Sequence, residues 1–279
     1  MSGEVTVRQA LALAGLVPLD AQVLLAHVLG KDRAWLAAHA DEAIAAGHAA
    51  MFAAFARRRR GGEPIAYLTG TREFWGLPIG VSPAVLIPRP ETETLVELAL
   101  ARLPAERDLR VLDLGTGSGA IALAIAHERP QARVLATDTS ADALEIARAN
   151  ARHLGLANVE FARSDWYADL PEHWRSACFD AIASNPPYVA AGDPHLDEGD
   201  LRYEPAVALA SGGDGLAAIR TIVAGARSRL APGGMLVVEH GYDQADRVRD
   251  LVAAAGFAEI VAMRDLAGIP RVVAGRLAG

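Results

Sequence analysis

The sequence predicts an α/β domain with a largely parallel sheet, preceded by a smaller domain built only from helices. From residue 110 onward, short apolar runs alternate with segments of helical periodicity, which is the pattern of strand–helix–strand units. Over residues 1–70 the apolar positions keep helical spacing and show no strand-like alternation. The 279 residues, 52% of them hydrophobic, are enough for two domains with packed cores.

The composition excludes several classes of protein. No apolar stretch approaches the roughly 20 residues of a membrane-spanning helix, and the N-terminus lacks the regions of a signal peptide. Cys178 is the single cysteine, which excludes an internal disulfide framework and fits a reducing cytoplasm. The eight histidines lack metal-ligand spacing. We therefore expect a cytoplasmic protein with no metal and no membrane segment.

The first domain is expected to span residues 1–70. Thr6 and Gln9 have the spacing of a capping box, which marks the start of the first helix. Further helices are predicted over 20–29, 33–39 and 42–60. The last of these ends in four arginines, Arg57–Arg60. We interpret them as cations at a helix C-terminus, and a contact with an acidic partner or RNA is the alternative.

A hairpin and linker are predicted over residues 71–90, because Pro78 in its second apolar run excludes a central strand. The α/β domain then occupies residues 91–279. Its predicted strands cover 110–114, 133–137, 159–162, 179–184 and 235–240, and its predicted helices cover 121–127, 141–154, 215–230 and 245–255.

The first predicted strand leads into a glycine-rich turn and then a helical segment. Glycine allows positive φ angles and close approach of the backbone to a ligand. The glycines alternate here, whereas dinucleotide enzymes use the spacing G-x-G-x-x-G. A purely structural turn is the alternative, but the strand ends that follow favour a cofactor site. The candidate cofactor-binding residues are Asp113, Gly115, Thr116, Gly117, Ser118 and Gly119.

Acidic and aromatic residues end the next two predicted strands. Asp138 can accept hydrogen bonds from two ribose hydroxyls. Its alternative role, a helix N-cap, can be filled by Thr139 or Ser140. Asp165 can accept from an adenine amine, and Trp166 can cover the flat face of the base. Ligands of open α/β sheets bind at the carboxyl ends of the strands, so these residues are expected at one site.

The fourth predicted strand runs into Asn185-Pro186-Pro187-Tyr188. The prolines lack N–H groups and hold the preceding residues extended. The turn therefore presents the side-chain oxygen of Asn185 and the carbonyl of Pro186 as acceptors, which can hold both hydrogens of one NH₂ group. Tyr188 supplies a flat surface beside them. We predict Asn185, Pro186 and Tyr188 as catalytic residues and all four as substrate-binding; a rigid structural turn is the alternative.

A planar NH₂ group is a poor nucleophile because its lone pair is delocalised. Holding both N–H bonds restrains the group and points the lone pair at an electrophilic methyl group, which is catalysis mainly by positioning. No general base is needed beforehand, because the nitrogen becomes strongly acidic only after it has taken the methyl.

The glycine loop, Asp138 and Asn185–Tyr188 resemble the class I S-adenosylmethionine-dependent methyltransferases that modify amino nitrogens. Four further segments, 72–78, 86–93, 192–196 and 202–205, resemble more narrowly the release factor glutamine methyltransferases. The resemblance covers nearly the whole chain and is weakest over the N-terminal helices. Residues 89–93 also fit a proline-started helix with acidic residues in its first turn.

The resemblance implies a Rossmann-like seven-stranded methyltransferase domain with its last strand reversed, and an all-helical N-terminal domain that docks the release factor. It implies S-adenosylmethionine as cofactor, with S-adenosylhomocysteine as product, bound through the glycine loop, Asp138, Trp166 and Asn185. The implied substrate is the glutamine of the Gly-Gly-Gln loop of peptide chain release factors, held by residues 185–188. We expect a monomer.

Other functions are weighed by charge and by the state of the motifs. Methylation of a base amine in DNA or ribosomal RNA is the main alternative, and we expect no stable nucleic-acid binding because acidic residues follow Tyr188. A nicotinamide dehydrogenase is disfavoured by the glycine spacing, and a non-enzymatic scaffold by the intact 185–188 loop. The acidic residues are Asp193, Asp197, Glu198, Asp200 and Glu204, with Arg202 among them.

Overall fold

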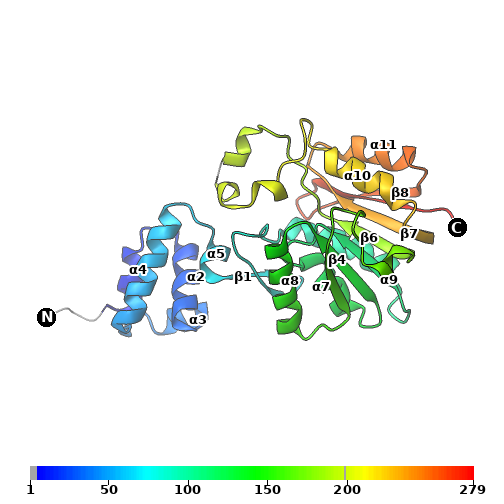
Figure 1. The fold of residues 1–279 in the computed structure, drawn as a ribbon. Helices are drawn as coiled ribbons and strands as arrows, with labels where there is room; N and C mark the ends of the chain where they lie inside the picture. Colours follow the sequence, from blue (N-terminus) through cyan, green and yellow to red (C-terminus); the bar gives the residue numbers. More distant parts are fainter. Residues whose placement is uncertain (1–4, 198) are drawn as a thin grey trace. The chain divides into compact units, whose positions relative to one another are not determined.

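The computed structural model describes residues 5–197 and 199–279 and contains two compact units (Figure 1). One unit holds residues 5–71 together with 199–203, and the other holds residues 72–197 and 204–279. Each unit has its own buried core, which is what the change of pattern along the sequence predicts.

The first unit is helical. Thr6 accepts from the backbone N–H of Gln9 at 3.3 Å while the Gln9 side chain accepts from Thr6 N at 3.0 Å, so the predicted capping box is confirmed. Gly30 ends the second helix with a left-handed backbone, φ 62°. The helices are α1 (Val7–Leu13), α2 (Pro18–Leu29), α3 (Arg33–Ala38), α4 (Ala46–Arg60) and α5 (Ile65–Thr69).

The prediction that the fourth helix begins at residue 42 is wrong by four residues. Thr6 and Ala43 form an antiparallel bridge, and the N–H of Ile44 donates to the carbonyl of Val5 at 2.9 Å. Ala43 and Ile44 therefore pair with the segment before α1, and α4 begins only at Ala46.

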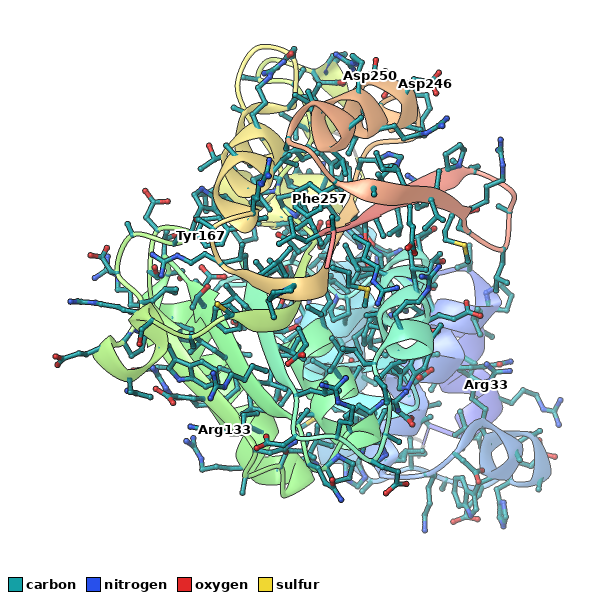
Figure 2. The ribbon with its side chains drawn as sticks, turned by 90° about the vertical axis from the view of Figure 1, so that its right-hand side faces the viewer. Arg33, Arg133, Tyr167, Asp246, Asp250 and Phe257 are labelled. Atoms are coloured by element: carbon teal, nitrogen blue, oxygen red, sulfur yellow. The ribbon has the colours of Figure 1, made fainter. Side chains whose placement is uncertain are left out.

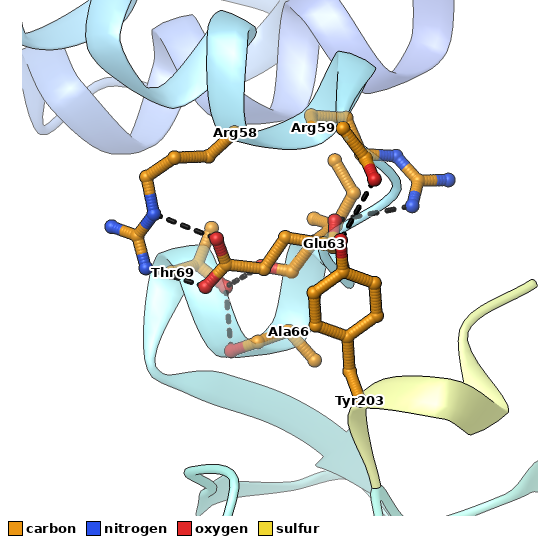
Figure 3. A network of polar contacts seen from close by, with 8 residues as sticks. Arg58, Arg59, Glu63, Ala66, Thr69 and Tyr203 are labelled. Carbon is orange, nitrogen blue, oxygen red and sulfur yellow. Dashed lines mark hydrogen bonds and ion pairs between the residues drawn. The ribbon is translucent and has the colours of Figure 1, made fainter.

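Arginines at the end of α4 form ion pairs within this unit (Figure 3). Arg58 pairs with Glu63 at 2.7 Å, and Arg59 pairs with Asp20 at 2.7 Å and with Asp200 at 3.0 Å. Tyr203 donates its hydroxyl to the carbonyl of Gly61 at 2.7 Å. These contacts agree with a structural role at a helix terminus for this part of the basic run.

The second unit is built on a seven-stranded sheet with the order β5-β4-β3-β6-β7-β9-β8. All neighbours from β5 to β7 pair in parallel, whereas β9 runs antiparallel to both β7 and β8. The expected seven strands with a reversed last strand are confirmed. The strands are β3 (Arg110–Leu114), β4 (Arg133–Asp138), β5 (Val159–Arg163), β6 (Phe179–Ser184), β7 (Leu230–Glu239), β8 (Ala258–Arg264) and β9 (Pro270–Arg276).

Helices pack against the sheet of the second unit. One face packs against α9 (Glu172–Arg175), α10 (Ala217–Ala226) and α11 (Ala245–Ala254), which share a core cluster with its apolar side chains. In Figure 2, Phe257 turns toward this interior, whereas Asp246 and Asp250 project from the outer side of α11. The other helices of this unit are α6 (Glu93–Arg102), α7 (Ala120–Glu128), α8 (Ala141–Leu154) and the short 3₁₀ turns Pro90–Thr92, Pro194–Asp197 and Ala206–Ala208, whereas the 3₁₀ turn Leu201–Tyr203 belongs to the helical unit.

The predicted boundary between residues 215–230 and 235–240 is wrong. The helix α10 ends at Ala226, and β7 already begins at Leu230, which pairs with Phe179. A register shift then lets Met235 pair with Ala181, so the Pro-Gly-Gly segment between them belongs to an irregular strand rather than to a loop.

The hairpin predicted after residue 70 is present as β1 (Thr71–Phe74) and β2 (Leu77–Gly80), which form a separate two-stranded sheet. Pro78 is exposed there, as the absence of its N–H requires of an edge position. Asn150 of α8 accepts from the backbone N–H of Gly80 at 2.8 Å and donates to its carbonyl at 3.0 Å. This buried amide fixes β2 on the second unit.

Candidate functional site

A cavity of about 520 Å³ lies where β3, β4, β5 and β6 end. This volume falls within the range of small-molecule sites. Nine of the residues predicted from the sequence line it: Gly115, Thr116, Gly117, Ser118, Asp138, Asp165, Trp166, Asn185 and Pro187. Asp113, Gly119, Pro186 and Tyr188 are not among its lining residues.

The glycine loop adopts conformations that other residues resist. Gly115, Gly117 and Gly119 have φ angles of 71°, 55° and 87°. A Cβ on Gly119 would also lie 3.1 Å from Leu123 and 3.2 Å from Ala147, because α7 starts there close to α8. The first two glycines carry the backbone along the cavity, and Gly119 permits the close packing of the following helix.

Asp113 lies beneath the loop instead of facing the cavity. Its side chain is fully buried and accepts from the hydroxyl of Thr116 at 2.6 Å. Burial raises the pKa of Asp113 to about 7, although the bond from Thr116 lowers it. The carboxyl therefore anchors the loop at an electrostatic cost, and a direct role in cofactor binding stays a prediction.

Asp113→Asn is expected to stabilise the protein selectively at high pH. A carboxyl whose pKa is raised from 3.8 to about 7 on folding loses stability as pH rises between those values. The variant lacks that loss, so its advantage should grow by about 2–4 kcal/mol from pH 4 to pH 8. Urea unfolding of both proteins at pH 4 and pH 8 measures their free energies of unfolding. A difference between variant and wild type that is the same at both pH values would contradict the raised pKa of Asp113.

Asp138 ends β4 with its carboxylate held by the backbone of two loops. Its oxygens accept from the N–H groups of Gly117 and Ser140, each at 2.9 Å. Ser140 is the N-cap of α8, because its hydroxyl accepts from the backbone N–H of Ala143 at 3.2 Å. The carboxylate of Asp138 is therefore not the capping group of this helix. An ionised carboxylate has about four lone-pair sites, and two remain for hydroxyl groups in the cavity.

Trp166 is held in an unusual backbone conformation at the end of β5, with φ 48°. Ser164 fixes this turn, because its hydroxyl donates to the carbonyl of Trp166 at 2.9 Å and accepts from Asp169 N at 3.0 Å. The half-buried indole lies beside the glycine loop, 3.6 Å from where a Cβ on Gly115 would be. The exposed Asp165 lines the same side of the cavity.

The loop after β6 presents Asn185 and Pro187 to the cavity. Pro186 is buried, and the ring of Tyr188 packs against the core beside α10 and α11. The Tyr188 hydroxyl donates to Glu239 at 3.2 Å, and its carbonyl accepts from the side chain of Gln244 at 2.9 Å. Burial raises the pKa of Tyr188 well above its usual value, so this phenol stays neutral.

Sequence reasoning missed the residues behind this loop. Thr92 accepts from the Asn185 side chain at 3.1 Å, and Glu239 accepts from Tyr188. Glu239 is the last residue of β7, whereas the predicted strand, 235–240, placed it one residue inside the strand end, so it was not singled out as Asp138 was. Thr92 gave no signal in the sequence, because the segment before α6 contacts Asn185 only through the fold.

Two segments far apart in sequence form another wall of the cavity. Glu204 accepts from Ile87 N at 3.0 Å and forms an ion pair with Arg89, which lines the cavity. Other lining residues from the two segments are Ala84, Val85, Leu86, Pro88, Pro205, Val207, Ala208 and Ala210.

The prediction that the acidic residues after Tyr188 form an acidic rim beside the site needs correction. The Glu204 side chain is fully buried against Arg89 because it organises the cavity wall, and Asp200 pairs with Arg59 inside the helical unit. The side chains of Asp197 and Glu198 lie outside the described residues. The charge argument against nucleic acid therefore loses part of its support.

The part of the chain that the structure describes offers no metal centre and no membrane-spanning helix. No group of three or more His, Cys, Asp or Glu residues there could hold a metal ion. Within the same residues, no helix is long and apolar enough to span a membrane. Cys178 is exposed between α9 and β6.

Two family models match the chain. One described as "Methyltransferase domain" matches residues 105–263, and one described as "PrmC N-terminal domain" matches residues 6–70. The first model lies mostly within the second unit, of which it leaves residues 72–104 and 264–279 unmatched, and the second model lies within the first unit.

Curated relatives match over nearly the full chain. A release factor glutamine methyltransferase of Burkholderia pseudomallei is 54% identical, covering 98% of this chain and 97% of the relative. The enzyme of that name from Escherichia coli is 47% identical, covering 92% and 91%. Among solved structures, a T. thermophilus 16S rRNA N2 G1207 methyltransferase in complex with AdoMet and guanosine has a TM-score of 0.55. It is 22% identical and the match covers 74% of this chain and 49% of that one, so it supports the fold alone.

Proposed function

The chain belongs to the family of release factor glutamine methyltransferases, and from this premise we propose that it methylates the side-chain amide nitrogen of the glutamine in the Gly-Gly-Gln motif of peptide chain release factors. The methyl donor is S-adenosylmethionine, and S-adenosylhomocysteine is the product. The site of action is the cytoplasm.

One observation carries this proposal most directly. Asn185 lines the cavity at the end of β6, and its NH₂ group is committed to Thr92 at 3.1 Å. Its side-chain oxygen is then the atom left to accept a hydrogen bond in the cavity. An acceptor at this place suits a substrate that brings an N–H group.

The residues of the cavity fit S-adenosylmethionine. The two remaining lone-pair sites of Asp138 suit the ribose hydroxyls, and Trp166 with Asp165 suits the adenine. The loop from Gly115 to Gly119, with its positive φ angles, lets the backbone approach the remainder of the molecule. When bound, S-adenosylmethionine supplies an electrophilic methyl group. Asp113 supports this loop from below.

The 185–188 loop orients the glutamine amide. The oxygen of Asn185 accepts one hydrogen of the amide NH₂. The carbonyl of Pro186 is the acceptor that we propose for the other, although Pro186 is buried and is not among the lining residues of the cavity. With both N–H bonds held, the nitrogen lone pair points in one direction, which lowers the entropic part of the barrier. Pro187 bounds the space around the amide, and Tyr188 holds the loop from behind through its bond to Glu239. Once methylated, the nitrogen is strongly acidic and loses its proton to water, so no base is required.

The helical unit is proposed to dock the release factor. Several of its large apolar side chains are exposed, namely Leu13, Val17, Leu19 and Met51, with exposed fractions from 49% to 77%. A release factor that covered these side chains would remove their apolar surface from water, which favours binding.

The test is methyl transfer with three separate acceptors. The purified protein is incubated with methyl-labelled S-adenosylmethionine and with release factor, DNA or ribosomal RNA from its own organism. A release factor with the motif glutamine changed to alanine is the control. Label on the wild-type factor and none on the control is the expected result.

Label on nucleic acid alone would overturn the proposed substrate, whereas the assignment of S-adenosylmethionine as methyl donor would stand. This outcome matters because the same acceptor pair can hold the exocyclic NH₂ of a base, and the correction of the acidic rim weakens the argument against it.

A further inference from the structure

Glu239 is a buried carboxylate directly behind the substrate-binding loop. It ends β7, is 1% exposed, and accepts the hydroxyl of Tyr188 on Oε1 at 3.2 Å. Arg271 of β9 acts on it only at a distance, because that guanidinium bonds to Asp265 at 2.9 Å. Oε2 has no hydrogen-bond partner among the described residues. A carboxylate is buried here at a cost that packing alone does not explain.

Thr92 connects this carboxylate to Asn185. Its hydroxyl oxygen accepts from Nδ2 of Asn185 at 3.1 Å, and its side chain also interacts with Glu239 and lowers the pKa of that group. Thr92 is 4% exposed, so bulk water does not compete for these contacts. Two members of the substrate loop, Asn185 and Tyr188, thus depend on one carboxylate.

The direction of the hydrogen bonds follows from the charge of Glu239. An ionised carboxylate only accepts, so the hydroxyl hydrogen of Tyr188 points toward it. Its negative charge also favours the orientation of the Thr92 hydroxyl in which the hydrogen faces the carboxylate. The oxygen of Thr92 is then left to accept from Nδ2 of Asn185. An amide turned by 180° would place Oδ1 against that oxygen, acceptor against acceptor. Its acceptor Oδ1 is therefore held toward the cavity.

We propose that Glu239 is a positioning residue for methyl transfer, which sets through Thr92 the orientation of the Asn185 amide and through Tyr188 the seat of the loop. The proposal rests on the proposed function, since it concerns how that site holds an NH₂ group. Glu239 itself does not line the cavity.

The protonation of Glu239 gives the proposal a pH signature. Burial raises its pKa to about 7; Thr92, Tyr188 and Arg271 lower it, and Glu91 raises it. Below this pH the carboxyl carries a hydrogen and can donate to Thr92, which releases the constraint on Asn185. The rate of methyl transfer at saturating substrates is expected to fall as pH drops through about 7.

Glu239→Gln tests the proposal with little change of shape. Its NH₂ group donates to the Thr92 oxygen, so the Thr92 hydrogen turns to Oδ1 of a flipped Asn185, and a donor faces the substrate NH₂. In single-turnover assays with release factor, the rate is expected to drop about 10–100-fold. The Kd for S-adenosylmethionine should stay within about twofold, and the fall in rate below pH 7 should disappear.

Two comparisons separate positioning from a general structural role. Thr92→Val removes the hydroxyl at constant shape and is expected to reproduce the loss in rate, whereas Thr92→Ser keeps the hydroxyl and should restore most of it. Glu160→Gln is the matched control and should behave as wild type. It changes a carboxylate on β5 that accepts a hydrogen bond from the indole of Trp174.

The side-chain NH₂ signals of Asn185 in ¹H–¹⁵N spectra, assigned by their loss in Asn185→Ala, give a readout independent of turnover. They should shift between pH 6 and pH 8 in wild type and not in Glu239→Gln. Asn185 NH₂ signals that do not change with pH in the wild type would overturn the inference about Glu239. A Glu239→Gln variant with the rate and pH profile of active wild type would do the same. Both outcomes would leave the proposed function standing. Wild-type protein that leaves release factor unlabelled refutes the proposed function instead, and the spectra still decide on Glu239.

Discussion

Asn185→Ala is expected to lower methyl transfer to release factor by about 10³-fold or more, because the variant loses the acceptor that orients the substrate amide. The Kd for S-adenosylmethionine should rise by no more than about tenfold, since Asp138 and the glycine loop keep their contacts. Single-turnover rates at saturating substrates and calorimetric cofactor titrations measure the two quantities.

Near-normal methylation by Asn185→Ala would refute the proposed mechanism. A variant that had lost cofactor binding and rate together would instead place Asn185 in the cofactor site. Thermal unfolding serves as the control, because loss of the single bond to Thr92 should change Tm by only a few degrees.

Asp138→Ala is expected to give the converse pattern. Two charge-assisted hydrogen bonds to the ribose hydroxyls would be lost, and the N–H groups of Gly117 and Ser140 would lose their acceptor. We expect the Kd for S-adenosylmethionine to rise about 100-fold or more, while the rate at saturating cofactor stays within about tenfold.

Glu145→Ala is the matched control for that variant. This carboxylate lies exposed on the same helix that follows Asp138, outside the cavity, so its removal should leave the Kd unchanged. An Asp138→Ala variant with the wild-type Kd would show that the carboxylate only holds the two loops together.

The residues at the strand ends that line the cavity could be predicted from the sequence because their signals are local. A residue that lines the cavity stands at or directly after the end of each of these strands, as with Asp138, the last residue of β4, and Asn185 after β6. Parallel strands bring their carboxyl ends to one edge of the sheet, so short motifs meet without any knowledge of packing.

The wall and the support of the site could not be predicted in this way. Thr92 meets Asn185 across 93 positions of sequence, and Glu204 meets Ile87 across 117. Whether a glutamate is an exposed charge or a buried partner of Arg89 depends on such contacts, and no periodicity within its own segment reports them. The same limit applies to β7, whose start at Leu230 is fixed by its neighbour Phe179.

The position of β9 has a consequence for the synthesis of the chain. It lies between β7 and β8 but follows both in sequence, so the nascent polypeptide displays two unpaired strand edges until residues 270–276 have left the ribosome. The sheet on which the cavity stands therefore closes late, by insertion of a strand between partners already made. Unpaired edges invite association with other chains, and a translation pause within β8 should make the nascent protein most dependent on chaperones.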